Sequence, residues 1–298
     1  MILDDQNAKA LRYKDLTIQG YSRAAVQTYW RIPEMKLGFD LGAQPWSFMG
    51  TPTWFISHTH MDHILALPAY VARRRMMKME PPKIYLPTKG VEPIRHILRN
   101  YSRLDRGRLP CDLIGVEPGD EIELSRELVV KVYATKHTIP SLGYIIWERR
   151  NKLKPEFVGL TGEKLRDLKL AGEEITAEIR IPRVAYLGDS CAEGLDNNPE
   201  MFEAEVLIME LTFLAKSHRE AAIDKFGHIF LGDIVERKDR FKNGLVAAGH
   251  FSTRYHPNQI RRLVRRELPD MLDGRLKLWI DGEPGLGRAS DEDDNTSG

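Results

Sequence analysis

The sequence has few cysteines and no long apolar runs. Its 298 residues include only Cys111 and Cys191, which stand far apart and outside any metal-binding spacing. Their scarcity excludes a disulfide framework and a zinc ribbon, and it favours a reducing cytoplasm. No apolar stretch is long enough to cross a bilayer, and the N-terminus has neither the basic start nor the apolar core of a signal peptide. We therefore expect a cytoplasmic soluble protein without a membrane partner.

The sequence also lacks an excess of positive or negative charge. Lysine and arginine total 44 and aspartate and glutamate total 43, which gives a formal net charge of +1. Because the overall field does not indicate a nucleic-acid partner, any attraction to RNA must come from local patches. The length and the 42% hydrophobic content fit a globular enzyme with a sizeable core.

Histidine is scarce as well, yet three of the nine histidines stand in one short segment, Ser57-His58-Thr59-His60-Met61-Asp62-His63. The apolar run before it, residues 53–56, predicts a buried strand, and residues 64–67 predict the start of a helix. A loop at the end of a strand lets several side chains converge on one point. Imidazole and carboxylate groups in this pattern supply ligands for two adjacent divalent metals. A metal pair suits the hydrolysis of a phosphodiester.

Short apolar segments and helical patterns alternate along the rest of the chain. Strands are expected in a meander over 13–40 and then at 83–86, 113–116, 128–133, 184–187, 206–209 and 245–248. Helices are expected at 64–79, 92–104 and 259–268, and the charged stretch 148–183 is also expected to be helical. Two groups of strands with helices between them predict a layered α/β sandwich. We expect one domain over 1–288, with residues 148–183 as an insert, and a disordered acidic tail at 289–298.

Three further potential ligands stand directly after apolar strands. They are His137 after the strand at 128–134, Asp189 after 184–187 and His250 after 245–248. Side chains in such positions gather at one edge of a sheet, which is where functional residues concentrate.

These motifs resemble the metallo-β-lactamase superfamily and, within it, the tRNase Z (ribonuclease Z) family of tRNA 3′-processing endonucleases in its short plant-type form. The shared segments are His58-x-His60-x-Asp62-His63, His137 with Ser141-x-Gly143-Tyr144, Gly188-Asp189, and His250-Phe251-Ser252-x-Arg254-Tyr255. The first motif marks the superfamily, and the last is much more specific. The resemblance covers about residues 15 to 280 and implies a four-layer αββα metallo-β-lactamase sandwich.

The resemblance implies a centre for two Zn²⁺, although Mn²⁺, Mg²⁺ and Fe²⁺ are not excluded. The metal ligands would be His58, His60 and His137 for one ion, Asp62, His63 and His250 for the other, and Asp189 as a bridge. A hydroxide between the metals would attack phosphorus and leave a 3′-hydroxyl on the tRNA. Asp62 would also orient or deprotonate that water.

Glu210 and His228 match the two family residues that protonate the departing alkoxide. A carboxylate that holds an imidazole protonated makes a general acid, commonly worth 10²–10⁴-fold. Met209 replaces the histidine that commonly precedes this glutamate, so nothing in the sequence orients Glu210 from that side. Ser190 replaces the usual threonine after Asp189 and keeps the hydroxyl.

The insert at 148–183 lies where many relatives carry a Gly-Pro-rich arm that binds tRNA. It lacks a Gly-Pro motif but is rich in basic residues, and the candidate RNA contacts are Arg149, Arg150, Lys152 and Lys154. Such contacts would be to phosphates and sensitive to salt. Acidic residues offset much of the charge, so a plain solvated helix is the alternative. The resemblance implies precursor tRNA as the partner and a homodimer, with the helix after His63 as a plausible interface.

Three other functions remain open. The first keeps the metal pair but hydrolyses a small-molecule phosphodiester or ester. The second is an iron oxidoreductase on the same fold, against which His60 and the motif at His250 argue. The third is an inactive RNA-binding or scaffold protein, against which the complete ligand set argues. Outside the motifs, His96 and His218 are expected at the surface and His256 in a loop or helix cap.

Overall fold

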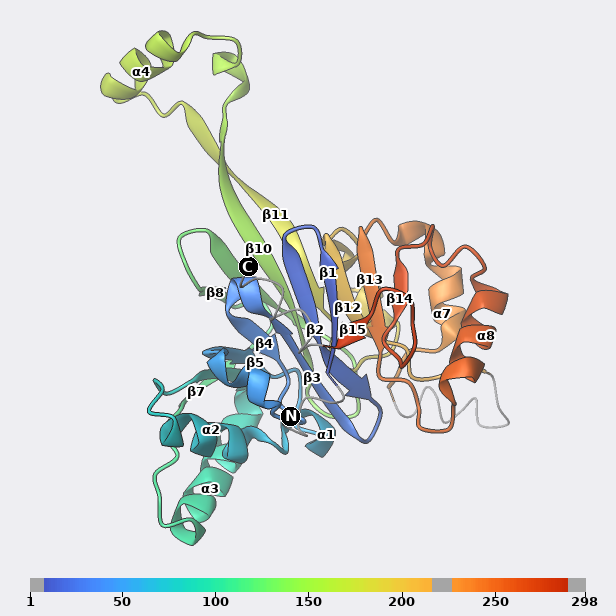
Figure 1. Ribbon diagram of the computed structural model, residues 1–298. Helices are drawn as coiled ribbons and strands as arrows, with labels where there is room; N and C mark the ends of the chain where they lie inside the picture. Colours follow the sequence, from blue (N-terminus) through green and yellow to red (C-terminus); the bar gives the residue numbers. More distant parts are fainter. Residues whose placement is uncertain (1–7, 216–226, 289–298) are drawn as a thin grey trace, which may run out of the picture.

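The computed structural model describes residues 8–215 and 227–288 as two β-sheets stacked face to face, with helices on both outer faces (Figure 1). The eight-stranded sheet has the order β15-β1-β2-β3-β4-β5-β6-β7 and the seven-stranded sheet the order β14-β13-β12-β11-β10-β9-β8. The strands of the first sheet are β1 Lys9–Tyr13, β2 Leu16–Arg23, β3 Gln27–Ile32, β4 Leu37–Phe39, β5 Thr53–Phe55, β6 Lys83–Pro87, β7 Asp112–Val116 and β15 Gly287–Arg288. Those of the second are β8 Glu121–Glu123, β9 Leu128–Ala134, β10 Leu142–Leu153, β11 Thr176–Tyr186, β12 Val206–Glu210, β13 Leu245–Gly249 and β14 Leu276–Leu278.

Most helices cover the outer faces of the sheets or lie in the loops between strands, and one lies far from the sheets, between β10 and β11 in the chain. They are α1 Met61–Ile64, α2 Leu67–Met76, α3 Thr88–Leu104, α4 Gly162–Leu170, α5 Glu193–Asp196, α7 Leu231–Glu236 and α8 Pro257–Glu267. The helices expected at 92–104 and 259–268 are confirmed by α3 and α8. No helix in the described ranges is long and apolar enough to cross a bilayer. The expected acidic tail at 289–298 and His218 lie outside the described residues.

Three apolar clusters define the layers. The central cluster contains Phe39 and Phe55 from one sheet and Tyr144 and Val184 from the other, so it lies between the sheets. A second cluster packs α2 and α3 against the first sheet, and a third packs α7 and α8 against the second. This order of helix, sheet, sheet and helix confirms the four-layer αββα sandwich.

Parallel pairing places the functional strand ends at a common edge. Strands β4, β5 and β6 run parallel in one sheet, and β11, β12 and β13 run parallel in the other. The carboxyl ends of parallel strands meet at one edge of their sheet. Residues that follow β4, β5, β11, β12 and β13 therefore gather there, although they are far apart in the chain.

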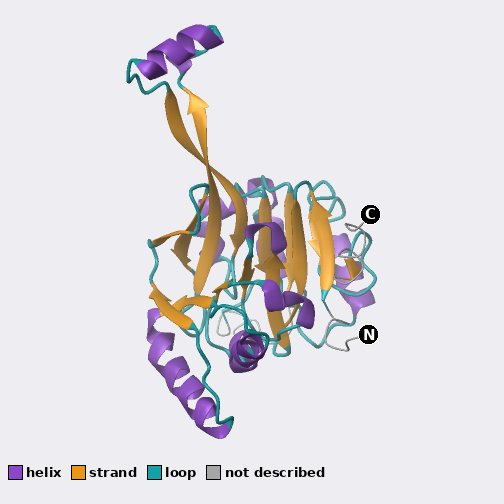
Figure 2. Cartoon of the chain, turned by 60° about the vertical axis from the view of Figure 1, so that its left-hand side comes forward, coloured by secondary structure: helices purple, strands orange, loops and turns teal. Residues whose placement is uncertain are grey.

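The helical prediction for 148–183 is wrong over most of its length. Strands β10 and β11 extend beyond the sandwich as an antiparallel arm, paired from Tyr144 with Tyr186 to Leu153 with Thr176, and α4 lies at its tip (Figures 1 and 2). Residues 148–153 and 176–183 continue two buried strands of the sheet, so inter-strand hydrogen bonding overrides the helical propensity of their charged side chains. Only α4 within the insert is an α-helix.

Candidate metal centre

Sharp turns at the strand ends direct the side chains toward one another. Asp40 follows β4 with φ 55° and His250 follows β13 with φ 58°, both in the left-handed region. Gly188 after β11 also has positive φ, and a Cβ there would lie 2.6 Å from the Cβ of Ser57. The glycine therefore allows the loop of Asp189 to approach the histidine segment that follows β5.

His58, His60 and His137 form the first group of ligand atoms. His60 Nδ1 lies 3.0 Å from His58 Nε2 and 3.2 Å from His137 Nε2. A tetrahedral metal with bonds of about 2.1 Å separates its ligand atoms by about 3.4 Å. One hydrogen bond cannot explain both contacts, because Nδ1 carries either a single proton to donate or a single lone pair to accept. Burial lowers the pKa of all three rings, so each favours the neutral form that binds metals.

Asp62, His63 and His250 form the second group. His63 Nε2 lies 3.3 Å from His250 Nε2, and the Asp62 Oδ2 atom lies 3.7 and 3.5 Å from these two nitrogens. Burial disfavours the charged form of Asp62, but the hydrogen bond with His250 and the charges of both rings lower its pKa to about 2. The carboxylate is therefore ionised and ready to bind a cation.

Asp189 lies between the two groups. Its Oδ2 atom is 3.3 Å from His250 Nε2, 3.4 Å from His63 Nε2 and 3.8 Å from His58 Nε2. Burial opposes its ionisation, but the adjoining His250 and His63 hold its pKa well below the usual range. The structure thus brings all seven sequence-predicted ligands together in overlapping groups that also take in His228 and Glu210, and the donor types and spacing of the seven fit divalent cations.

Asp40 was missed in the sequence because it belongs to no recognised motif. Its Oδ2 atom lies 2.6 Å from His63 Nδ1, and the carboxylate also accepts from the Ser57 backbone N–H at 2.7 Å and from the Tyr186 hydroxyl. A carboxylate on one ring nitrogen fixes the tautomer and directs the other nitrogen at the metal. The only signal in the sequence is its place directly after a short apolar strand.

Three more histidine ligands have an oxygen atom beside the ring nitrogen that is not directed at the cluster. His58 Nδ1 lies 3.0 Å from Ser57 Oγ, and His137 Nδ1 lies 2.9 Å from the Gly227 carbonyl oxygen. His250 Nδ1 lies 3.0 Å from Thr212 Oγ1. These contacts orient each ring, so the cluster is preorganised by the protein.

Beside the cluster, the buried Glu210 is paired with the partly buried His228. His228 Nδ1 lies 2.8 Å from Glu210 Oε1. Burial alone would lower the pKa of His228, but the charge and hydrogen bond of Glu210 raise it to about 9. The sequence offered no residue to orient Glu210 from the side of the missing histidine, but other groups hold this side chain. Its carboxylate accepts from the Ser190 N–H at 2.8 Å, the Ile229 N–H at 3.3 Å and the Thr212 hydroxyl.

The histidines outside the motifs occupy ordinary positions. His96 is exposed on α3, as expected. His256 is the N-cap of α8, where its Nδ1 atom accepts from the Asn258 backbone N–H at 3.4 Å. The expected loop or cap role of His256 is therefore confirmed.

Most of the candidate RNA contacts in the arm are paired with carboxylates. Arg149 lies 2.5 Å from Glu123, Arg150 lies 2.5 Å from Glu148, and Lys154 lies 3.7 Å from Glu174. Lys152 is exposed and makes no ion pair with any described residue.

The fold and the clustered ligands define a metallo-β-lactamase-fold protein with a candidate metal centre. The structure resembles the metallo-β-lactamase-fold protein YhfI of Bacillus subtilis, with a TM-score of 0.59, 13% identity and coverage of 91% of this chain and 95% of that one. It also resembles the short form of human tRNase Z, ELAC1, with a TM-score of 0.50, 18% identity and coverage of 82% and 88%. No family model matches the sequence.

Sequence similarity identifies the family to which the chain belongs within this fold class. It is 36% identical to tRNase Z TRZ1 of Arabidopsis thaliana over 279 residues, which cover 93% of this chain and 99% of the relative. The chain belongs to the tRNase Z (ribonuclease Z) family.

Proposed function

We propose that this protein is a metal-dependent endoribonuclease that removes the 3′ trailer from precursor tRNA and leaves a 3′-hydroxyl on the tRNA. The observation that carries the proposal is the two neighbouring ligand groups with Asp189 between them and the His228–Glu210 pair beside them. The close similarity to a plant tRNase Z over nearly the whole chain supports RNA as the substrate. The two free cysteines support a reducing compartment such as the cytoplasm.

The seven ligands would hold two divalent ions, and a set of five imidazoles and two carboxylates favours Zn²⁺. When bound, such a pair supplies an activated water and neutralises charge on the phosphate. Asp62 is positioned by the Ala25 backbone N–H, which donates to its Oδ2 atom at 2.9 Å. Glu210 holds the Nδ1 side of the His228 ring. This leaves the Nε2–H of the protonated imidazole to donate to the departing ribose O3′.

A precursor tRNA with a 3′ trailer tests the proposal directly. We expect metal-loaded protein to release the trailer, and we expect a chelator or His63→Ala to abolish the reaction. His96→Ala, a change at an exposed histidine, serves as the matched control and should cleave normally. Gel analysis of end-labelled RNA measures the product. Hydrolysis of bis(p-nitrophenyl) phosphate with an intact trailer would instead favour the small-molecule hydrolase, and activity supported natively by iron would overturn the zinc assignment.

We further propose a single domain in which the arm of residues 148–183 is an insert that binds RNA phosphates. The central apolar cluster joins both sheets, which supports one folding unit. Lys152 on the arm and Lys164 and Lys169 on α4 are exposed and make no ion pair with a described residue. They are therefore better phosphate ligands than Arg149, Arg150 and Lys154, whose charges are already offset.

Shortening the arm tests this role. Lys154 N–H donates to the Ile175 carbonyl oxygen at 3.0 Å, so a tight turn can replace residues 155–174 and close the hairpin. We expect precursor tRNA binding to weaken while hydrolysis of a small diester is unchanged. Filter binding and a colorimetric assay measure the two properties. A shortened protein that binds tRNA as tightly as the full chain would refute the role of the arm.

We also propose that two copies associate, through a surface at α1 and α3 beside the helix after His63 that the sequence suggested. Exposed apolar side chains gather on and directly after these two helices, with 67% exposure at Met61, 59% at Leu65, 49% at Tyr101 and 80% at Leu104. Such a patch marks an interaction surface. We expect Leu65→Glu to yield a monomer in sedimentation, whereas Val158→Glu, at an equally exposed apolar side chain on the arm, should leave the dimer intact. A wild-type protein that sediments as a monomer would contradict the proposal.

A further inference from the structure

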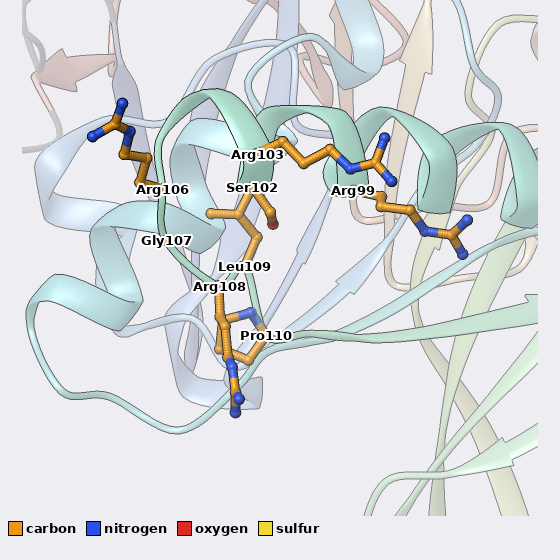
Figure 3. A pocket seen from close by; sticks show the side chains of 8 residues that line it. All are labelled: Arg99, Ser102, Arg103, Arg106, Gly107, Arg108, Leu109 and Pro110. Carbon is orange, nitrogen blue, oxygen red and sulfur yellow. The ribbon is translucent and has the colours of Figure 1, made fainter.

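Four arginines surround a hollow at the C-terminal end of α3. The hollow has a volume of about 530 Å³, and its basic lining residues are Arg99, Arg103, Arg106 and Arg108. All four are exposed, and none makes an ion pair with a residue in the described ranges. Figure 3 shows their guanidinium groups spread around the hollow. Arg75, a neighbouring arginine, is in contrast paired with Asp105 at 3.0 Å. The hollow therefore carries positive charge that no carboxylate of the described residues pairs with.

This hollow is one end of a path along α3 and β7. An adjoining hollow of about 250 Å³ shares Arg99 and Leu109 and adds Arg95. At the other end of the helix, Thr88 and Lys89 line a third hollow, of about 400 Å³, together with His137 of the ligand cluster. Since β7 is the last strand of its sheet, the path follows an exposed edge. The 17-residue helix is about 25 Å long, which sets the distance that the path covers.

The basic residues of α3 form a stripe that is separate from its apolar face. Arg95, Arg99 and Arg103 recur every four residues, so they lie on one side of the helix with a rise of about 6 Å between neighbours. This rise is comparable to the separation of successive phosphates in an extended single strand. Ile97 and Tyr101 instead line a hollow together with α1 residues. The proposed dimer surface and the arginine path are therefore on different sides of α3.

We propose that the basic residues of this path, which are Lys89, Arg95, Arg99, Arg103, Arg106 and Arg108, bind the backbone of the single-stranded 3′ trailer as it leaves the ligand cluster. The inference rests on the proposed function. The RNA on the 5′ side of the cut is a base-paired stem, whereas the trailer is a single strand that can leave the cluster through the hollow shared by His137 and Lys89. Basic residues outnumber the acidic Glu92, Asp105, Asp112 and Glu117 along the path. Of these, Glu92 is already paired with Arg95 and Asp105 with Arg75. Arginine contacts to phosphates carry no base preference, so trailers of any sequence can bind.

Precursors with trailers of graded length test the path. For the wild-type protein, we expect KM to fall as the trailer lengthens from a single nucleotide until it can follow the length of α3. In the double variant Arg99→Ala/Arg103→Ala, we expect KM for the longest trailers to rise about tenfold. We also expect the slope of log KM against log salt to fall by about 1.4 for two lost phosphate contacts. The kcat value and the cleavage of the shortest trailer should be unchanged. Arg265→Ala, an exposed arginine on α8, is the matched control.

The outcomes separate this inference from the proposed function. If the wild-type protein with metal cleaves no precursor, the proposed function fails, and binding of a labelled single-stranded oligoribonucleotide still compares the variant with the control. If KM responds to trailer length equally in the wild type and the double variant, the path is wrong and the proposed function stands. An equal loss for short and long trailers would mean that the arginines contact the tRNA body, which also overturns the trailer path.

Discussion

Asp189→Asn is expected to reduce precursor tRNA cleavage by more than about 10³-fold, beyond the 10²–10³-fold that loss of one charge-stabilising donor typically costs. The Oδ2 atom of Asp189 lies within 3.8 Å of ring nitrogens in both ligand groups. An amide is neutral and has one acceptor oxygen, so it cannot balance two cations as the carboxylate does. Metal content by mass spectrometry and single-turnover cleavage together measure the effect.

Two further variants calibrate this result. Asp40→Asn removes the carboxylate behind His63 and leaves the ligand set complete, so we expect a smaller loss of about 10- to 100-fold in metal affinity. Asp239→Asn, at an exposed aspartate, should change neither metal content nor rate. Circular dichroism checks that each variant is folded. If Asp189→Asn bound two ions and cleaved normally, the shared-ligand role of Asp189 would be excluded.

His228→Ala is expected to lower precursor cleavage by about 10²–10⁴-fold while leaving hydrolysis of bis(p-nitrophenyl) phosphate nearly unchanged. The ribose O3′ is a poor leaving group and needs a proton, whereas p-nitrophenolate departs without one. Glu210 stabilises the protonated ring and raises the pKa of His228 to about 9, so the imidazole is charged at neutral pH. Comparing the two substrates separates proton donation from metal binding.

The matched control is again His96→Ala, which should cleave both substrates at the wild-type rate. An equal loss on both substrates after His228→Ala, together with lower metal content, would assign His228 to the metal centre. The geometry allows such a role, because the His228 ring lies near Asp189, with 3.9 Å between His228 Nδ1 and Asp189 Oδ2. Glu210→Gln should follow His228→Ala in direction, since it removes the charge that keeps the ring protonated.

The sequence predicted the candidate site better than the surroundings that support it. The seven ligand residues were recognisable because each lies in a motif or directly after an apolar strand. Asp40 was not, because its contact with His63 depends on how β4 pairs with β5. The orientation of Glu210 was also missed. Its hydrogen-bond donors, from Ser190 and Ile229, come from neighbouring loops that spacing along the chain does not reveal.

The arm of residues 148–183 likewise shows that local sequence does not reveal pairing between distant segments. Charged residues at 148–153 and 176–183 favour a helix locally, but they continue buried strands and are held by the ladder between β10 and β11. In the arm, strand pairing with a distant segment outweighs the local helical propensity. In contrast, α3 and α8 form where their amphipathic patterns predict helices.

The sequence by itself determined the donor set, the alternation of strands and helices, and the family resemblance, because these depend on residue type and local order. Only the tertiary structure decided that two sheet edges align to bring His58 and His250 into one cluster. It also decided which basic side chains are paired, since Arg103 is exposed and has no ion pair with a described residue while Arg150 is paired with Glu148. The reason is physical, since contact and charge neutralisation depend on distances between segments that are remote in the chain.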